Sequence, residues 1–312
     1  DIIAGGAGAD TLSQGAAGGD DNLDGGAGND TVTLAGANKD DTISGGDGTD
    51  TLVINAALGY NTTTPLNDAA NISGFEVLQV GTTLSQVMTP LSGITSLVVD
   101  AGAVATLTKV DAITAVTLGA GAGAGADLTL ATDGSADDLT VSLGSDLSQT
   151  ASTAATLDAV DYETITVNSA GANGNAITVT ATDLTGLTVA GSKNVTVTVN
   201  PDTGATTLAG LTSVDASGAT GTVNVQAASA DAGVAVTPGS GALTVNLGDG
   251  ADTVTGTAVA DSITTAKGND TVTGLGGNDT IDAGAGDDTV TAGDGDNSIT
   301  LGAGADTLTA GD

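Results

Sequence analysis

The sequence predicts an all-β fold, an elongated parallel β-solenoid of the β-roll or β-helix type, in which two acidic repeat blocks flank a middle rich in Thr, Val and Ala. Three observations carry this prediction. Aspartate recurs at a fixed spacing of nine residues near the C-terminus and at spacings of nine and eleven near the N-terminus. Glycine, with 49 of the 312 residues, gathers in the loops before those aspartates. The middle alternates β-branched and polar residues, which favours strands over helices.

The N-terminal block, residues 1–54, repeats with alternating spacings of 9 and 11 residues. An aliphatic residue stands two positions after each repeated aspartate, as Val32 does after Asp30. Six residues of turn and three of strand make half a coil, so every second aspartate is expected to stack on the one before. The repeated aspartates are Asp1, Asp10, Asp21, Asp30, Asp41 and Asp50.

The C-terminal block, residues 247–312, keeps a strict nine-residue spacing. Thr or Ser follows each repeated position, and an aliphatic residue follows that, which predicts short strands with inward-facing Val, Ile or Leu. The repeated positions are Asp252, Asp261, Asp270, Asp279, Asp288, Asn297 and Asp306.

The middle, residues 55–246, is predicted to be a Thr-, Val- and Ala-rich β-solenoid. Its period-two runs, such as residues 163–168 and 194–200, read as strands separated by turns of Gly, Ser, Asn and Asp. A short helix or turn is expected near residues 82–89. Scattered acidic residues here, such as Asp100 and Asp215, are expected to cap turns.

Composition excludes several classes of function. The chain has no His and no Cys, so it can hold neither a Ser-His-Asp triad nor a thiolate or imidazole metal site. It has no Arg, only four Lys and a net charge of −34, which excludes nucleic acid as a partner. No apolar run approaches the roughly 20 residues of a membrane span, so no direct membrane insertion is expected. We expect no enzyme activity, because the aspartates form regular columns and substrate-stacking aromatic residues are missing.

The stacked aspartates create an electrostatic problem that divalent cations would solve. Neighbouring strands lie roughly 4.8 Å apart, and two carboxylates at that distance repel by about 3.5 kcal/mol at an effective dielectric near 20. A folded, ion-free roll is therefore expected to be unstable, and low aromatic content with high charge also fits disorder of the ion-free chain. Of the 38 acidic residues only Glu76 and Glu163 are glutamate. This bias favours a set of ligands built on turns, because Asp also serves in the turn itself.

Calcium suits such a site best, because it accepts six to eight oxygen ligands with flexible geometry, including backbone carbonyls. Zinc and copper would prefer the absent His and Cys. A weaker site is expected in the column of Asp261, where Val259 replaces a loop glycine and Asn297 replaces an aspartate. The expected metal ligands are Asp10, Asp30, Asp50, Asp21, Asp41, Asp252, Asp270, Asp288, Asp306, Asp261, Asp279 and Asn297, with the loop residues Gly6, Gly8, Gly26, Gly28, Gly46, Gly48, Gly250, Gly268, Gly286 and Gly304.

These glycine-rich loops resemble the RTX (repeats-in-toxin) calcium β-roll over residues 1–54 and 247–312. In that family, aspartate carboxylates of successive turns and loop carbonyls hold calcium between coils. The order of segments narrows the resemblance: GGDGTDTLV at 45–53, ISGFEVL at 72–78, and SVDASGATG at 213–221 before the second block. This order is similar to that of RTX-type bacterial surface-layer (S-layer) proteins of the Caulobacter kind.

The resemblance implies an extracellular structural protein that is exported unfolded by type I secretion, folds on meeting calcium and assembles into a two-dimensional lattice. The partners it implies are other copies of the chain and cell-surface polysaccharide. Because the sequence begins and ends inside repeats, we expect the secretion signal and the anchor to lie outside this segment. Two alternatives stay open: the repeat region of a secreted RTX adhesin, and the non-catalytic region of a secreted hydrolase.

Overall fold

The computed structural model describes residues 1–15, 19–34, 40–54, 72–81, 84–87, 93–100, 103–110, 113–119, 125–130, 137–143, 155–159, 161–170, 174–201 and 207–311. Strands, turns and isolated bridges make up this part of the chain, and it contains no helix. No segment in these ranges therefore forms a helix long and apolar enough to cross a membrane. The chain divides into two compact units, Asp1–Gly134 and Ser135–Asp312, which are described separately below.

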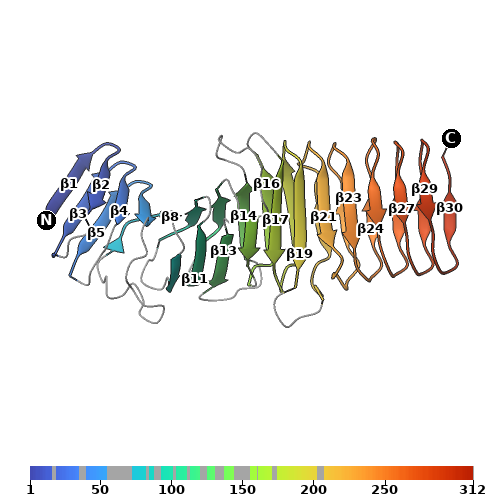
Figure 1. Cartoon of the computed structure of the whole chain (residues 1–312), viewed down its shortest axis with the longest axis horizontal. Helices are drawn as coiled ribbons and strands as arrows, with labels where there is room; N and C mark the ends of the chain where they lie inside the picture. Colours follow the sequence, from blue (N-terminus) through green and yellow to red (C-terminus); the bar gives the residue numbers. More distant parts are fainter. Residues whose placement is uncertain are drawn as a thin grey trace. The chain divides into compact units, whose positions relative to one another are not determined.

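The first unit contains strands of three parallel sheets (Figure 1). One sheet has the order β1-β3-β5-β7, with β1 Ile2–Ala7, β3 Asn22–Ala27, β5 Thr42–Asp47 and β7 Ile72–Ser73. In the second, the successive neighbours are β2 Thr11–Gln14, β4 Thr31–Leu34, β6 Thr51–Ile54, β8 Val77–Val80, β10 Ser96–Val99 and β12 Ala115–Leu118. In the third they are β9 Leu84–Val87, β11 Val104–Val110 and β13 Gly125–Leu130.

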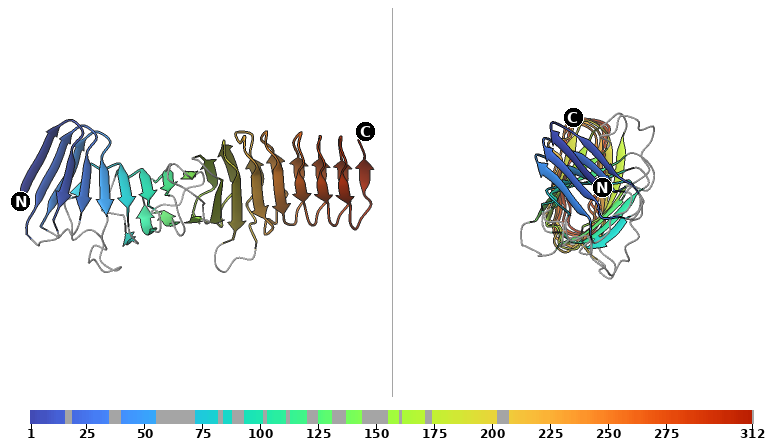
Figure 2. Two further views of the ribbon diagram at one scale, coloured as in Figure 1. Left: turned by 45° about the horizontal axis from the view of Figure 1, so that its top comes forward. Right: turned by 90° about the vertical axis from the view of Figure 1, so that its left-hand side faces the viewer.

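The second unit contains two parallel runs of strands that alternate along the chain. One run consists of β14 Asp138–Leu143, β16 Thr164–Ser169, β18 Gly186–Gly191, β20 Ser213–Asp215, β22 Ala235–Thr237, β24 Thr253–Thr255, β26 Thr271–Thr273, β28 Thr289–Thr291 and β30 Thr307–Thr309. The other consists of β15 Ala155–Asp158, β17 Asn175–Thr180, β19 Val195–Asn200, β21 Val223–Ala227, β23 Leu243–Leu247, β25 Ser262–Thr264, β27 Thr280–Asp282 and β29 Ser298–Thr300. Figure 2 shows the strands that follow β23, coloured orange to red, lying side by side.

Strand register fixes the length of one coil. In the C-terminal block, Thr253 pairs with Thr271 and Thr271 with Thr289, so one coil takes 18 residues. In the N-terminal block, Thr11 pairs with Thr31, so one coil takes 20. Each coil therefore contains two half-coils, of 9 and 9 or 9 and 11 residues. The predicted all-β parallel solenoid and the stacking of every second aspartate are confirmed.

The core is a stack of small and branched aliphatic side chains between the sheets. Val254, Val272 and Val290 succeed one another in one sheet and Ile263 and Ile281 in the facing one, and all five are buried. Burying one such side chain stabilises the fold by about 1.5–3 kcal/mol. The outward positions between them carry Thr or Ser, as the alternation predicts. The core thus holds one half-coil to the next, and the aspartates lie at the turns beside it.

The structure corrects one expectation, and the predicted domain boundaries remain a prediction. The segment near 82–89, expected as a short helix or turn, contributes strand β9, because it pairs in parallel with β11 from Ala105 to Thr108. The predicted division at 54 and 246 follows composition, whereas the two compact units divide at 134. Each repeat block therefore shares a unit with part of the Thr- and Val-rich middle.

Loop glycines let successive turns stack closely. Gly286 has a φ of 149°, and a Cβ there would lie 1.7 Å from the carbonyl oxygen of Gly268, one coil earlier. Such a position excludes any side chain, both by its backbone conformation and by contact with backbone. The ten glycines predicted as loop ligands all have positive φ: Gly6, Gly8, Gly26, Gly28, Gly46, Gly48, Gly250, Gly268, Gly286 and Gly304.

Substitution at one of these positions should be costly. We expect Gly286→Ala to lower the free energy of unfolding in calcium buffer by about 2 kcal/mol or more, because it combines a disallowed backbone conformation with a backbone clash. The matched control is Gly186→Ala in strand β18, where a Cβ would meet only side-chain atoms, the nearest at 3.3 Å. Denaturant unfolding followed by circular dichroism measures both. Equal stabilities of the two variants would contradict the tight stacking.

Candidate metal-binding site

Aspartates of successive coils are joined by a ladder of hydrogen bonds from backbone to side chain. The N–H of Asp252 donates to Oδ1 of Asp270 at 2.7 Å, that of Asp270 to Asp288 at 2.9 Å, and that of Asp288 to Asp306 at 3.0 Å. The ladder begins at Val234, whose N–H donates to Asp252 at 2.7 Å. One carboxylate oxygen of each aspartate is therefore used to hold its turn to the preceding coil.

The N-terminal block has the same ladder. The N–H of Asp10 donates to Oδ1 of Asp30 at 2.8 Å, and that of Asp30 donates to Asp50 at 2.7 Å. It extends one coil beyond the repeats, where the N–H of Asp50 donates to Glu76 at 2.8 Å. The repeat spacing gave no sign of Glu76, because it lies 26 residues after Asp50 instead of 20.

The second carboxylate oxygen of these aspartates is buried and has no hydrogen-bond donor. A buried carboxylate oxygen without a partner is costly, because it loses its hydration and gains nothing in return. The fold therefore leaves a row of negative oxygens that require either a proton or a cation. Within the described residues, these oxygens are Oδ2 of Asp10, Asp30, Asp50, Asp252, Asp270, Asp279 and Asp288.

Backbone carbonyl oxygens share the space with these carboxylates. A Cβ placed on Gly25 would lie 2.5 Å from Oδ2 of Asp30 and 2.2 Å from the carbonyl oxygen of Gly45. Likewise, a Cβ on Gly274 would lie 2.5 Å from Oδ2 of Asp279. Glycine thus leaves room where carboxylate and carbonyl oxygens of two coils face each other. Carboxylate and carbonyl oxygens are the hard ligands that calcium prefers, so this donor set fits the ion.

No three carboxylates converge on a single point among the residues that the structure describes. A bound ion would therefore need carbonyl ligands in addition to aspartate. The contribution of the loop glycines through their backbone and the assignment of individual ligands stay predictions.

Burial controls the protonation of the carboxylates. Desolvation raises the pKa of Asp252 from 3.8 to about 7, with the nearby charge of Asp270 as a smaller cause. Desolvation is also the largest cause of the raised pKa of Asp50, Asp270 and Asp279. The sequence argument placed mutual repulsion first. Burial is the larger effect, because the Gly-rich turns seal each carboxylate against the next coil.

The facing column of the C-terminal block is less uniform. The N–H of Leu243 donates to Oδ1 of Asp261 at 2.7 Å, and the N–H of Thr257 donates to its Oδ2 at 2.5 Å. Both oxygens of Asp261 therefore have protein donors, and Thr257 supplies the donor that Oδ2 lacks in Asp252, Asp270 and Asp288. This is the loop in which Val259 replaces glycine, and the geometry supports the expectation of a weaker site there.

The rest of this column keeps the ladder. The N–H of Asp261 donates to Oδ1 of Asp279 at 2.9 Å, and that of Asp279 donates to Oδ1 of Asn297 at 2.9 Å. The side-chain nitrogen of Asn297 donates to the carbonyl of Gly293 at 3.1 Å. Asn297 thus preserves the hydrogen bond but brings no negative charge.

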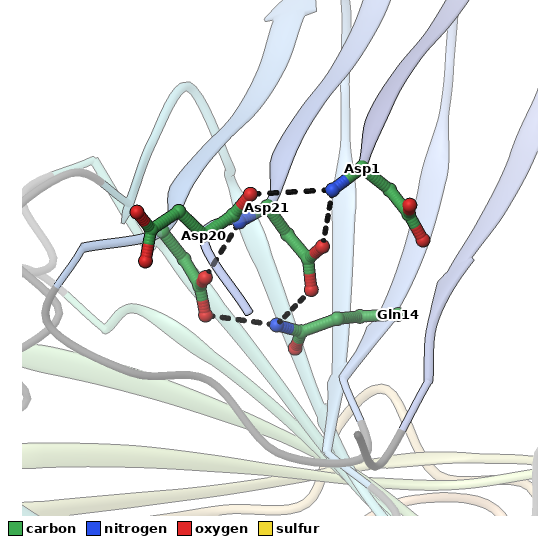
Figure 3. Close-up of polar contacts among 5 residues, drawn as sticks. Asp1, Gln14, Asp20 and Asp21 are labelled. Carbon is green, nitrogen blue, oxygen red and sulfur yellow. Dashed lines mark hydrogen bonds and ion pairs between the residues drawn. The ribbon is translucent and has the colours of Figure 1, made fainter. Parts of the chain in front are cut away.

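The second N-terminal column, Asp21 and Asp41, differs from all others. The N–H of Asp21 donates to Oδ1 of Asp41 at 2.9 Å, as in the ladder. Here, however, the side-chain amide of Gln14 donates to Oδ2 of both aspartates (Figure 3). The backbone nitrogen of Asp1 also lies 2.8 Å from Oδ1 of Asp21.

An outer row of asparagines was missed by sequence reasoning. Oδ1 of Asn29 accepts the N–H of Thr49 at 3.0 Å, and Oδ1 of Asn269 accepts that of Asp287 at 2.9 Å. These bonds run in the opposite direction to the ladder, from a later coil to an earlier side chain. The signal was present, because Asn29 and Asn269 each stand directly before a repeated aspartate.

A scattered aspartate of the middle behaves as expected. Oδ1 of Asp215 accepts the N–H of Ser217 at 2.8 Å, which is a local turn bond. Hydrogen bonds from Ser217 also hold the pKa of Asp215 below its ordinary value. Asp215 is therefore a turn cap, as predicted.

A family model of the RTX calcium-binding nonapeptide repeat matches the chain in four copies, over residues 1–32, 33–53, 246–281 and 282–312. The chain carries RTX calcium-binding repeats. Comparisons with curated proteins and with solved structures gave no match. The RTX matches fall on the two blocks that contain the ladders and the partnerless oxygens, so calcium is the ion that these repeats imply. When bound, calcium would neutralise the buried carboxylates and join successive coils.

The raised pKa of Asp252 predicts a pH dependence in metal-free buffer. Its folded-state pKa of about 7 lies above the ordinary 3.8, so the folded state binds the proton more tightly. The stability of the ion-free protein should therefore be greatest below about pH 4 and fall as pH rises toward 7. In Asp252→Asn this fall should be smaller, because Asn keeps an oxygen for the Val234 N–H and carries no charge.

Thermal unfolding in calcium-depleted buffer between pH 4 and pH 8 measures this. In calcium buffer at pH 7.5 the order should reverse, and Asp252→Asn should be the less stable protein. A wild-type stability in calcium-depleted buffer that rises between pH 4 and pH 7 would contradict the burial of ionised carboxylates.

Proposed function

We propose that this chain is a structural calcium-binding protein of the bacterial cell surface that assembles into a calcium-dependent two-dimensional S-layer lattice. The RTX repeats support a calcium-binding protein of the secreted or surface class. The single observation that carries the calcium part is the row of buried, partnerless Oδ2 atoms in both repeat blocks.

Calcium would act as the folding switch. Extracellular calcium modules bind at roughly 0.1–1 mM, whereas the cytoplasm holds far less free calcium. The chain would stay unfolded during type I export, because its carboxylates cannot be buried without a cation. On meeting external calcium, the ladders would close and the coils would stack.

The order of segments and the amino-acid composition support the proposed lattice role. Two calcium blocks flank a Thr- and Val-rich solenoid, and the order of segments resembles RTX-type S-layer proteins. With no His, no Cys and three aromatic residues, the chain offers scaffold surface instead of catalytic machinery. We therefore propose no enzyme activity. The proposed partners are further copies of the chain and, through a region outside this segment, cell-surface polysaccharide, without nucleic acid and without membrane insertion.

A calcium titration with two matched variants tests this function. Asp270→Asn keeps an oxygen for the Asp252 N–H but removes a buried charge, whereas Asp183→Asn removes a charge from an exposed position. At pH 7.5, where the carboxylates would be ionised, circular dichroism should show strand formation only with calcium. The midpoint for Asp270→Asn should be higher by about tenfold or more, because the variant removes one charged ligand, and a tenfold shift corresponds to about 1.4 kcal/mol. The midpoint for Asp183→Asn should equal that of the wild type.

Electron microscopy of the same samples then distinguishes a lattice protein from an adhesin. Ordered sheets are expected in calcium and their loss in EGTA. A chain that folds with calcium but stays monomeric at high concentration would contradict the lattice and favour the adhesin. A chain that folds equally well in EGTA would contradict the calcium role itself.

A further inference from the structure

Gln14 breaks the pattern of the N-terminal core. It ends strand β2 and pairs in register with Leu34, which in turn pairs with Ile54. Leu34 and Ile54 point inward and are fully buried, and Gln14 is likewise inward with 3% of its surface exposed. A polar side chain therefore occupies a position that the next two coils fill with aliphatic residues. Such a position is costly for an amide unless its groups find partners.

The Gln14 amide finds those partners in the column of 11-residue half-coils. Its Nε2 donates to Oδ2 of Asp41 at 2.8 Å and to Oδ2 of Asp21 at 3.1 Å. Figure 3 shows the side chain reaching toward Asp21 from the side opposite Asp1. An amide nitrogen carries two protons, one for each carboxylate, and an ionised carboxylate accepts only. Oε1 is left buried without a donor, so Gln14 gives up one hydrogen bond to form two with charged groups.

The corresponding oxygens in the neighbouring column have no such partner. Oδ2 of Asp30 and Oδ2 of Asp50 are buried without a donor, although both aspartates keep the same Oδ1 bond to a backbone N–H. The two columns therefore differ in what their Oδ2 atoms contact, which is a side-chain amide at Asp21 and Asp41 and no hydrogen-bond donor at Asp30 and Asp50.

We propose that the Gln14 amide takes the place of a cation between Asp21 and Asp41, so that this pair holds no calcium. Sequence spacing alone predicted both as ligands. The inference rests on the proposed calcium role of the other aspartates. It divides the N-terminal block into one calcium-dependent column, through Asp10, Asp30 and Asp50, and one pair closed by the chain's own side chain.

Counting bound ions in two matched variants tests the proposal. Asp30→Asn and Asp41→Asn each replace a buried aspartate whose Oδ1 accepts a backbone N–H, in the same block. The probe is calcium alone, bound to the full chain at saturation and measured by equilibrium dialysis and isothermal titration. Asp30→Asn should lose at least one ion and require several-fold more calcium to fold. Asp41→Asn should keep the wild-type number. A loss of ions in Asp41→Asn equal to that in Asp30→Asn would overturn the proposal.

A second variant gives a gain of binding. Gln14→Glu replaces the donor with a third carboxylate facing Asp21 and Asp41, so it should bind one calcium ion more than the wild type. This arm decides the question if Asp41→Asn does not fold. An unchanged ion count in Gln14→Glu would show that the amide does not occupy a cation position. A wild type that binds no calcium would instead refute the proposed function, which keeps the two failures apart.

Discussion

Both repeat blocks depend on aspartate carboxylates of which only one oxygen has a hydrogen-bond donor. In both repeat blocks there are aspartates whose Oδ1 accepts a backbone N–H from the neighbouring coil, while their Oδ2 is buried without a donor. A buried polar group without a partner costs about 1–3 kcal/mol. Seven such oxygens in the described residues would together cost about 7–20 kcal/mol, as much as the 5–15 kcal/mol that holds a typical domain together. A cation between the coils would remove this cost and add attraction, so we expect calcium to be a condition of folding.

The candidate cation site depends on stacked aspartates, inward aliphatic residues and loop glycines. The short coil places each aspartate above its equivalent, and inward Val and Ile fix that register from the core side. Glycines before each aspartate let carbonyl oxygens of the next coil approach closely, as at Gly25 and Gly45. Where an element of this set is missing, the chain replaces it. Thr257 supplies donors to Asp261, Asn297 keeps the hydrogen bond without the charge, and Gln14 bridges Asp21 and Asp41.

Periodicity made the regular features predictable. The nine-residue spacing predicted the parallel solenoid, the half-coils and the inward aliphatic residues, all of which the structure shows. The contacts of Gln14 and Thr257 with neighbouring aspartates could not be predicted, because they depend on which face each side chain occupies. Gln14 reads as an ordinary polar strand residue until the pairing with Leu34 shows that it points inward. The dominance of desolvation at Asp252 also requires the burial that only the stacked turns create. Near residues 82–89 the sequence predicted a short helix or turn, whereas Leu84–Val87 forms strand β9 because it pairs with β11.

The most direct test is a high-resolution crystal structure of the chain grown in calcium, with the ions located by anomalous scattering. If the buried carboxylates require a cation, anomalous peaks should lie about 2.3–2.6 Å from Oδ2 of Asp30, Asp252, Asp270 and Asp288. Ordered coils whose Oδ2 atoms show no ion within that distance would contradict the central claim that cations hold the turns together.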